Sequence, residues 1–323
     1  MKLCGCNPHF SPYVFLGMIL VKSVELAEGV HVAIGPHFPQ CNTVVLVSET
    51  VTVIDPGCPL ETLRFTLRKL GKEINDIDYV VLSHIHPDHI THASRIERTS
   101  RCRIVANDIT APLFDEKEEM KCFLGFHKGE LVRPLWENLV NERMYGALDE
   151  GRTNFVVKDQ EEISLGDHTL RMVYTPGHLP DHMCIELVES NLLYSADIDC
   201  TEFGPFYGHW NSSITEFKQS IEFILSSNYE GLISGHLGQP LLREFKDPLK
   251  SFLRQFDVRE DLVLLEISGG ARTLGEIMAH PLIYPSLSNP VFLYFEKWMI
   301  EHHVQELLKK GKVWLKKNQI LPT

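Results

Sequence analysis

The spacing of apolar residues predicts short strands and a helix in the first third of the chain. Apolar and β-branched residues fill 42–48 and 50–54, and a turn-forming Asp-Pro-Gly triplet at 55–57 ends the second run. Leucines then recur at every third or fourth position from 60 to 70, which is the spacing of a helix with one buried face. A further apolar run at 79–83 predicts a buried strand.

The pattern changes between about residues 110 and 154. This stretch has a helical composition with several aromatic residues, so we predict a helical insertion there, with a lid over the rest of the domain as one interpretation. From Glu162 onward the chain returns to short strands separated by turns. Strands are expected at 169–175, 183–188, 192–195 and 231–234.

A different pattern begins near Pro248. Thr273 and Glu276 have the spacing of a capping box that opens a short helix, and apolar residues between 300 and 307 give a second helix one buried stripe. A basic strand is predicted at 312–317. Helix, helix and strand together resemble a small winged-helix unit. We therefore expect a large layered α/β domain at 1–247 and a small winged-helix-like unit at 248–323.

Composition and charge narrow the classes of function. With 323 residues, 44% of them hydrophobic, the chain is long enough to bury a full core. Its formal net charge of −12 does not provide the basic field of an electrostatic nucleic-acid binder, although a local basic patch stays open.

The first residues suggest neither a membrane span nor a secretory signal. The apolar run 13–21 is too short to cross a bilayer and has no cleavage-site pattern, so we expect a buried first strand in a cytoplasmic protein without membrane contact. The eight cysteines are scattered and are expected to be reduced. Cys4 and Cys6 alone are a weak metal signal, and a loose terminal segment is the preferred interpretation.

The strongest chemical signal follows the predicted strand 79–83. The segment His84-Ile85-His86-Pro87-Asp88-His89 places three imidazoles and one carboxylate within six residues. These are the ligand types that bind zinc and iron, and a loop at a strand end can turn several of them toward one point. A histidine-rich surface loop is the alternative, but four ligand-type residues in six disfavour it.

Single ligand-type residues also follow three later strands. His178 follows the strand 169–175, Asp197 follows 192–195 and His236 follows 231–234. Any one of them alone would more often be an ordinary structural residue. Because sites in α/β proteins assemble at strand ends along one sheet edge, we expect all three to join the first cluster. The total of seven ligands suits two metal ions, each with an open position.

The order His-x-His-x-Asp-His, Gly-His, Ala-Asp, Gly-His resembles the metallo-β-lactamase superfamily, over about residues 30–242. The resemblance implies a four-layered αββα sandwich. It further implies that His84, His86 and His178 hold one metal ion, that Asp88, His89 and His236 hold the other, and that Asp197 bridges them. Asp55 matches the aspartate of that family which supports the ligands without binding metal.

Such a site predicts hydrolytic chemistry. Two divalent cations about 3.5 Å apart would share a water whose pKa falls to near 7, and would polarise the oxygen of the bond under attack. Zinc is the preferred metal, with iron or manganese as alternatives. Asp88 is the best candidate for a general base or proton shuttle. The aromatic segment 203–210 follows Asp197 closely, and we predict that Tyr207 or His209 contacts substrate there, with an aromatic turn packed on the insertion as the equal alternative.

Three reactions are compatible with these residues, because one dinuclear centre serves many substrates. The first is hydrolysis of a small-molecule thioester, ester, lactone or lactam. The second is cleavage of single-stranded RNA, because the C-terminal unit resembles the appendage of lactamase-like ribonucleases and carries lysines that would meet phosphates or merely face solvent. These lysines are Lys309, Lys310, Lys312, Lys316 and Lys317. The third is a mononuclear iron persulfide dioxygenase, which the full set of seven ligands disfavours. A homo-oligomer is compatible with all three.

Overall fold

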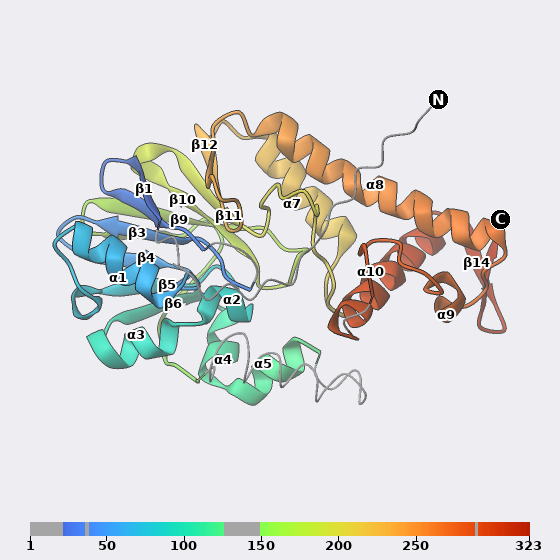
Figure 1. The fold of residues 1–323 in the computed structure, drawn as a ribbon, viewed down its shortest axis with the longest axis horizontal. Coiled ribbons are helices and arrows are strands. Elements are labelled where there is room, and N and C mark those ends of the chain that lie inside the picture. Colours follow the sequence, from blue (N-terminus) through green and yellow to red (C-terminus); the bar gives the residue numbers. More distant parts are fainter. Residues whose placement is uncertain (1–21, 36–38, 126–148, 288–289) are drawn as a thin grey trace, which may run out of the picture.

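The computed structural model describes residues 22–35, 39–125, 149–287 and 290–323 (Figure 1). The strand predicted at 13–21, the Cys4 and Cys6 pair and the middle of the predicted insertion lie outside these ranges.

Seven strands form the first sheet in the order of the sequence. They are β1 (Ser23–Ala27), β2 (Val30–Ala33), β3 (Thr43–Val47), β4 (Val51–Ile54), β5 (Tyr79–Val81), β6 (Arg103–Asn107) and β7 (Thr153–Val157). The first four pair antiparallel, and β4 to β7 pair parallel. Alternation along β3 sends Val44 and Leu46 to one face and Val45 to the other, so both faces are covered by apolar packing.

The second sheet has the order β13-β12-β11-β10-β9-β8. Its strands are β8 (Glu162–Leu165), β9 (His168–Tyr174), β10 (Met183–Leu187), β11 (Leu192–Ala196), β12 (Gly231–Ser234) and β13 (Leu241–Leu242). Only β11 and β12 run parallel; the other pairs are antiparallel. Leu46 on the first sheet and Ile185 on the second belong to one buried cluster, so the two sheets pack face to face.

Helices cover the outer face of each sheet and complete four layers. The helices and turns are α1 (Leu60–Lys69), η1 (Ile74–Asp76), α2 (Pro87–Ile90), α3 (Ala93–Ser100), α4 (Thr110–Asp115), α5 (Lys117–Phe123), η4 (Val188–Ser190) and α7 (Ile214–Ser226). Leu63 of α1 and Ile96 of α3 pack on the first sheet. Phe217 of α7 packs with Leu193 on the second. The predicted αββα sandwich is confirmed, and α4 and α5 provide the helices expected at the start of the insertion.

The C-terminal part consists of three helices and a hairpin. These are α8 (Lys246–Gly269), α9 (Leu274–Ile277), α10 (Pro290–Lys309), β14 (Val313–Lys316) and β15 (Gln319–Pro322). The capping box of Thr273 and Glu276 is present, and the apolar stripe 300–307 is buried. The helix α8 runs through the boundary that the sequence suggested: Phe256 packs with the second sheet, whereas Val263 packs with α10. The unit therefore shares its longest helix with the sandwich. No helix in the described ranges is both long and apolar enough to cross a membrane.

Candidate metal centre

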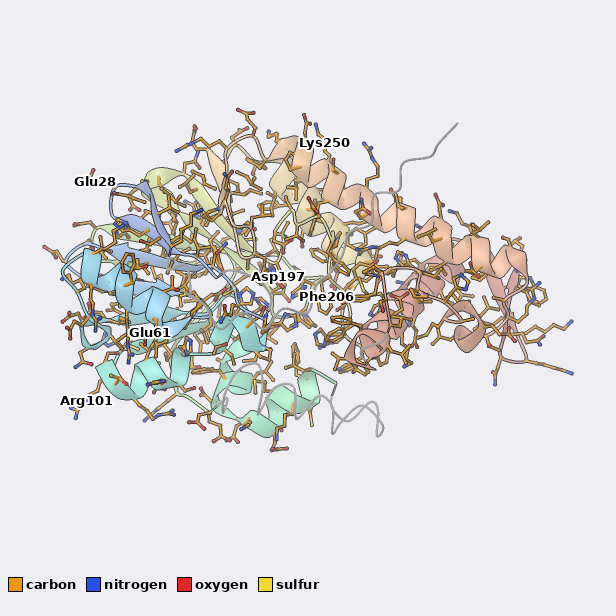
Figure 2. All side chains as sticks on the ribbon, in the orientation of Figure 1. Glu28, Glu61, Arg101, Asp197, Phe206 and Lys250 are labelled. Carbon is orange, nitrogen blue, oxygen red and sulfur yellow. The ribbon has the colours of Figure 1, made fainter. Side chains whose placement is uncertain are left out.

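Strand ends on one side of the sandwich bring the predicted ligands together. His84, His86 and the short helix α2, which carries Asp88 and His89, follow β5. The other three, His178, Asp197 and His236, follow β9, β11 and β12. Figure 2 shows Asp197 between the sandwich and the C-terminal helices.

One oxygen of the buried Asp197 carboxylate faces three imidazoles. Its Oδ2 lies 3.0 Å from Nε2 of His178, 3.8 Å from Nδ1 of His86 and 4.0 Å from Nε2 of His84. These four residues offer ligand atoms that all lie within 4.8 Å of one another. They form the first cluster, in the combination that the sequence predicted.

The other oxygen of Asp197 faces a second cluster. Its Oδ1 lies 2.8 Å from Nε2 of His89 and 3.2 Å from Nε2 of His236. Asp88 completes this cluster, with its Oδ2 3.8 Å from Nε2 of His236 and 4.0 Å from Nε2 of His89. The structure thus brings all seven predicted ligands together and places Asp197 between the two groups.

The donor set fits metal ions. Nε2 of His84 is buried and has no hydrogen-bond partner, and Nε2 of His89 makes no aligned hydrogen bond although Oδ1 of Asp197 lies 2.8 Å away. Buried polar atoms are normally paired, so two imidazole nitrogens that face one carboxylate without a regular hydrogen bond indicate that a further group belongs there. Histidine and aspartate are the ligands that zinc and iron accept. The role of the seven residues as ligands stays a prediction, which the experiments below test.

Hydrogen bonds on the far side of three imidazoles fix their tautomers. His89 donates from Nδ1 to Oδ2 of Asp55 (2.7 Å), and His178 donates from Nδ1 to the carbonyl oxygen of Phe206 (2.8 Å). Nδ1 of His84 lies 2.9 Å from the hydroxyl of Ser83, which itself donates to Asp55. In each case the partner can accept a hydrogen bond from Nδ1, so Nε2 is the nitrogen that would face a metal ion.

The electrostatics of the two clusters differ. Burial lowers the pKa of His84 and of His86 well below the ordinary value, so both are neutral. Burial alone would raise the pKa of Asp197, but His178, His89 and His236 outweigh it and hold that pKa well below its usual range. Burial would lower the pKa of His236, yet Asp197 and Asp88 raise it to about 9. A cation bound through His236 would therefore have to displace a proton from its ring.

Two glycines allow the ligand loops to approach their neighbours. A Cβ on Gly57 would lie 1.6 Å from the backbone oxygen of Asp88, so only glycine lets the turn after β4 pack against α2. Gly177, just before His178, has a φ of +127° and touches the backbone of Phe217. These contacts fix where two of the ligand-bearing segments lie.

The two residues predicted to contact substrate are both buried. Tyr207 is fully buried, and its hydroxyl lies 2.7 Å from Nε2 of His303, so it faces the C-terminal helices. His209 is also buried, and its Nε2 lies 2.9 Å from Nε2 of His86. The polar ends of both side chains are thus occupied by protein, which does not support a substrate contact. Phe206 between them is partly exposed, and its ring lies 6.1 Å from that of His86 and 5.8 Å from that of His178.

Sequence reasoning missed a fully buried histidine behind the site. Nε2 of His182 accepts a hydrogen bond from the backbone N–H of Asp197 (3.3 Å), while its Nδ1 lies 2.9 Å from the carbonyl oxygen of Thr175. Burial lowers the pKa of His182 to about 3, so the ring stays neutral and holds the Asp197 backbone. Its position four residues after His178 was the only signal in the sequence.

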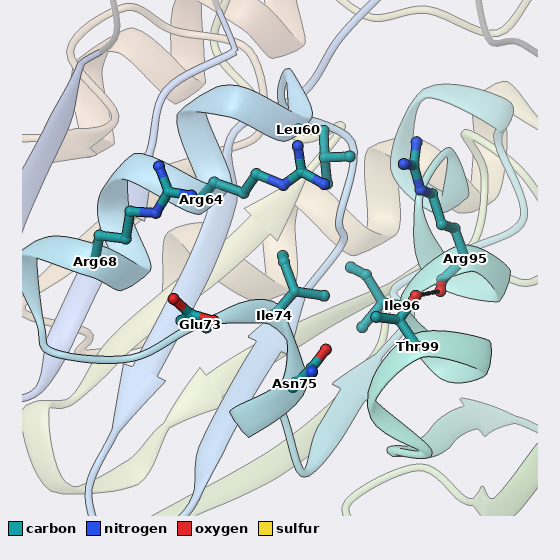
Figure 3. A pocket seen from close by; sticks show the side chains of 9 residues that line it. All are labelled: Leu60, Arg64, Arg68, Glu73, Ile74, Asn75, Arg95, Ile96 and Thr99. Atoms are coloured by element: carbon teal, nitrogen blue, oxygen red, sulfur yellow. Dashed lines mark hydrogen bonds between the residues drawn. The ribbon is translucent and has the colours of Figure 1, made fainter.

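A separate groove of about 470 Å³ lies on the outer helical layer, between α1, η1 and α3 (Figure 3). Arg64, Arg68 and Arg95 line it together with Glu73. Arg64 is paired with Glu61 at 2.7 Å. None of the lining residues belongs to the two ligand clusters.

Comparison with known sequences places the chain among metal-dependent enzymes. The profile of the metallo-beta-lactamase superfamily matches residues 38–236. A metallo-beta-lactamase fold-containing protein of Sulfurisphaera tokodaii is 26% identical over 270 residues, which cover 78% of this chain and 92% of that relative. An atrochrysone carboxyl ACP thioesterase of Aspergillus fumigatus is 24% identical over 186 residues. The latter match covers 52% of this chain and 42% of that relative.

Comparison with solved structures gives the same fold over almost the whole chain. A metallo-beta-lactamase family protein of Thermus thermophilus superposes with a TM-score of 0.72 and 18% identity. The match covers 93% of this chain and 100% of that one, so it includes the C-terminal helices as well as the sandwich.

Proposed function

The chain belongs to the metallo-beta-lactamase superfamily and is a metal-dependent hydrolase, and from this premise we propose that it cleaves a small-molecule thioester at a dinuclear metal centre. An ester, lactone or lactam is the alternative substrate for the same site.

The position of Asp197 carries the proposal of two ions. Its Oδ2 faces His84, His86 and His178, and its Oδ1 faces His89 and His236. A carboxylate whose two oxygens face two separate sets of imidazoles is arranged to bridge two cations. A single ion would leave one of these two sets of imidazoles without a cation to bind.

The residues have distinct roles in this proposal. The first cluster would hold one ion and the second cluster the other, with Asp197 between them. When bound, the ions supply Lewis acidity, which polarises the scissile carbonyl and lowers the pKa of water. Asp88 is the candidate to accept the proton of the attacking water and to return it to the leaving group. Its Oδ2 lies 3.8 Å from Nε2 of His236 and 4.0 Å from Nε2 of His89.

Two observations favour a small thioester. Phe206 is partly exposed beside His86 and His178, so an apolar surface adjoins the first cluster where an acyl chain would pack. The similarity to the atrochrysone carboxyl ACP thioesterase agrees with this substrate class. A thiol has a pKa of roughly 8.5 and leaves more readily than an alcohol, so one proton-carrying residue such as Asp88 suffices.

Three of the five C-terminal lysines are paired with carboxylates, which weakens the RNA alternative. Lys310 and Lys312 both contact the carboxylate of Glu260, at 2.5 and 3.1 Å, and Lys309 contacts Glu306 at 2.8 Å. Side chains already paired with carboxylates make poor phosphate contacts, because the pair must break first.

Metal content and hydrolysis test the proposal together. Protein purified without added metal should contain close to two transition-metal ions per chain, and should cleave a thioester faster than matched ester, lactone and lactam substrates. Asp197→Asn should lose at least one ion and most activity, because one bridging oxygen becomes an amide that binds cations poorly. Asp78→Asn is the matched control: the Asp78 carboxylate accepts a hydrogen bond from the backbone N–H of Val51, so this change should keep both ions.

Two outcomes would contradict the proposal. About one ion per chain, iron only, with persulfide-dependent oxygen uptake would replace the proposal with the dioxygenase. Two ions in Asp197→Asn with full activity would make Asp197 an ordinary turn residue.

A further inference from the structure

The segment between Asp197 and α7 contains a loop, residues 203–210, that contacts two of the predicted ligands. The carbonyl oxygen of Phe206 accepts the hydrogen bond from Nδ1 of His178. His209 lies against the ring of His86, with the two Nε2 atoms 2.9 Å apart. Both His178 and His86 belong to the first cluster.

The contact with His209 selects one tautomer of His86. Nδ1 of His86 faces the cluster, 3.8 Å from Oδ2 of Asp197. If this atom is to bind a cation, the proton must sit on Nε2 and be donated to Nε2 of His209. His209 then carries its own proton on Nδ1, which lies 3.3 Å from the carbonyl oxygen of Leu124. The three groups form one consistent chain of donors and acceptors that leaves Nδ1 of His86 unprotonated.

The loop is held in turn by α8. Arg259 is 5% exposed and donates to the carbonyl oxygens of Phe203 and Pro205, the latter at 2.6 Å. Its guanidinium also lies 3.4 Å from the hydroxyl of Tyr207 and stacks over the Phe203 ring at 4.8 Å. A planar guanidinium with several donors can fix several carbonyls at once, which a flexible ammonium cannot do.

The helix α10 holds the other end of the loop. His302 lies with its Nε2 2.7 Å from the carbonyl oxygen of His209 and donates to it. His303 contacts the hydroxyl of Tyr207, and the ring of Phe295 packs edge-on against Phe206 at 5.0 Å. In Figure 2, Phe206 lies beside Asp197 at the point where the C-terminal helices meet the sandwich.

The second cluster has different supports. His89 is oriented by Asp55 in the turn after β4, and Nδ1 of His236 lies 3.3 Å from the carbonyl oxygen of Gln40. Both supports belong to the first sheet and its loops. His84 of the first cluster shares the Asp55 support through Ser83, so the 203–210 loop is specific to His178 and His86.

We propose that the C-terminal helices are part of the metal centre: through the 203–210 loop, Arg259 and His302 hold the imidazoles of His178 and His86 in the orientation that binds the first ion. Arg259 and His302 are positioning residues that act through backbone carbonyls and touch neither metal nor substrate. This inference rests on the proposed dinuclear function.

Two arginine variants in the C-terminal unit test the contact between Arg259 and the 203–210 loop. Arg259→Met removes the donors but keeps most of the apolar stem. Arg272→Met is the matched control, because Arg272 donates to the carbonyl oxygens of Ile267 and Ala271 within the same unit and has no such bond to the loop. Competition titration of zinc with a chromogenic chelator should show two equivalents in wild type. Arg259→Met should weaken one of them by about 10- to 100-fold and leave the other, whereas Arg272→Met should keep both.

Two variants of His302 test the contact between His302 and the 203–210 loop, and they remain informative if Arg259→Met folds poorly. His302→Ala removes the donor to the carbonyl of His209, and His302→Gln can restore it with an amide N–H. Zinc affinity of one equivalent should fall in the alanine variant and recover in the glutamine variant. Recovery would separate positioning from general packing, because both changes remove the imidazole ring.

The outcomes distinguish this inference from the proposed function. If wild type binds fewer than two ions, the dinuclear function fails. If wild type binds two and Arg259→Met binds two with unchanged affinity, the function stands and the inference is overturned. Equal losses in Arg259→Met and Arg272→Met, or equal losses in the two His302 variants, also overturn it, since the C-terminal helices would then contribute only general stability.

Discussion

Asp55 offers the sharpest test of how the second cluster is held. Its carboxylate is fully buried and accepts four hydrogen bonds: two from Ser83, one from His89 and one from Tyr194. Asp55 also has a φ of +48°, a left-handed conformation that asparagine and aspartate adopt more readily than other non-glycine residues. Asp55→Asn therefore changes the hydrogen bonding and the charge while it preserves the backbone.

The amide cannot satisfy all four donors. Placed with its oxygen toward His89 and Tyr194, it turns its NH₂ toward the backbone N–H of Ser83; placed the other way, the NH₂ meets His89. Losing a charged acceptor and leaving a buried donor unpaired costs about 2–4 kcal/mol in free energy of unfolding. The second placement also lets His89 move its proton to Nε2, which would remove its lone pair from the cluster. Zinc affinity of one equivalent should then fall by about 10- to 100-fold.

Two measurements separate these effects. Denaturant unfolding of chelator-treated protein gives the stability cost, and chelator competition gives the affinity. Asp78→Asn is a suitable control: its carboxylate accepts one backbone hydrogen bond, from Val51, and contacts no predicted ligand, so the loss should be about 1 kcal/mol with unchanged zinc binding. Asp55→Ala should unfold more easily than Asp55→Asn, by at least about 1 kcal/mol, because alanine disfavours the positive φ. If Asp55→Asn matches wild type in both assays, the proposed support of His89 is wrong.

Two further predictions concern a buried carboxylate and the C-terminal lysines. Burial raises the pKa of Asp181 to about 6, so above that pH the ionised carboxylate costs stability, and the cost disappears as pH falls toward its unfolded value. In chelator-treated protein, the free energy of unfolding of Asp181→Asn relative to wild type should therefore rise by about 3 kcal/mol between pH 4 and 7, and a flat difference would contradict this reasoning. Neutralising the lysines should leave thioester hydrolysis and RNA binding at two salt concentrations unchanged; a loss of RNA affinity with a weaker salt dependence would instead favour the nuclease. The lysines to change are Lys309, Lys310, Lys312, Lys316 and Lys317.

The grouping of the seven candidate ligands could be predicted because its signals are local. Four ligand-type residues occur within 84–89, and His178, Asp197 and His236 each follow a short apolar run whose alternation marks a strand. Strand ends in layered α/β folds lie along one edge, so sequence position was enough to bring them together. The structure places all seven side chains around one centre.

The surroundings of the ligands could not be predicted in the same way. Tyr207 and His209 follow Asp197 closely in the sequence, which suggested a substrate contact. In the structure, the Tyr207 hydroxyl contacts His303 of α10. His302, also on α10, donates to the carbonyl oxygen of His209. Those partners lie more than 90 positions away in the sequence, and nothing in the local pattern indicates them. The support of His178 is a main-chain carbonyl, a group that every residue carries and that leaves no trace in the sequence.

The predicted boundary near Pro248 has a local explanation. Proline is tolerated in the first turn of a helix, where its missing N–H needs no partner, and Pro248 is the third residue of α8. The change of composition there coincides with the start of α8, and the domain boundary itself stays a prediction. Because α8 then extends past Phe256 and Arg259, the same helix packs on the second sheet and holds the 203–210 loop.

The two supports meet at Asp197. Asp55 orients His89 on the side of Oδ1, and the loop held by Arg259 orients His178 on the side of Oδ2. A carboxylate between two cations must keep both oxygens in place, so a shift of either imidazole would change the position of the other ion as well. The backbone N–H of Asp197 is held independently by His182. This contact limits how far the Asp197 carboxylate can move toward either cluster. The C-terminal helices, a turn after β4 and a buried histidine thus constrain one side chain from three directions, and the proposed support predicts that the first ion binds tightly only when the C-terminal unit is folded.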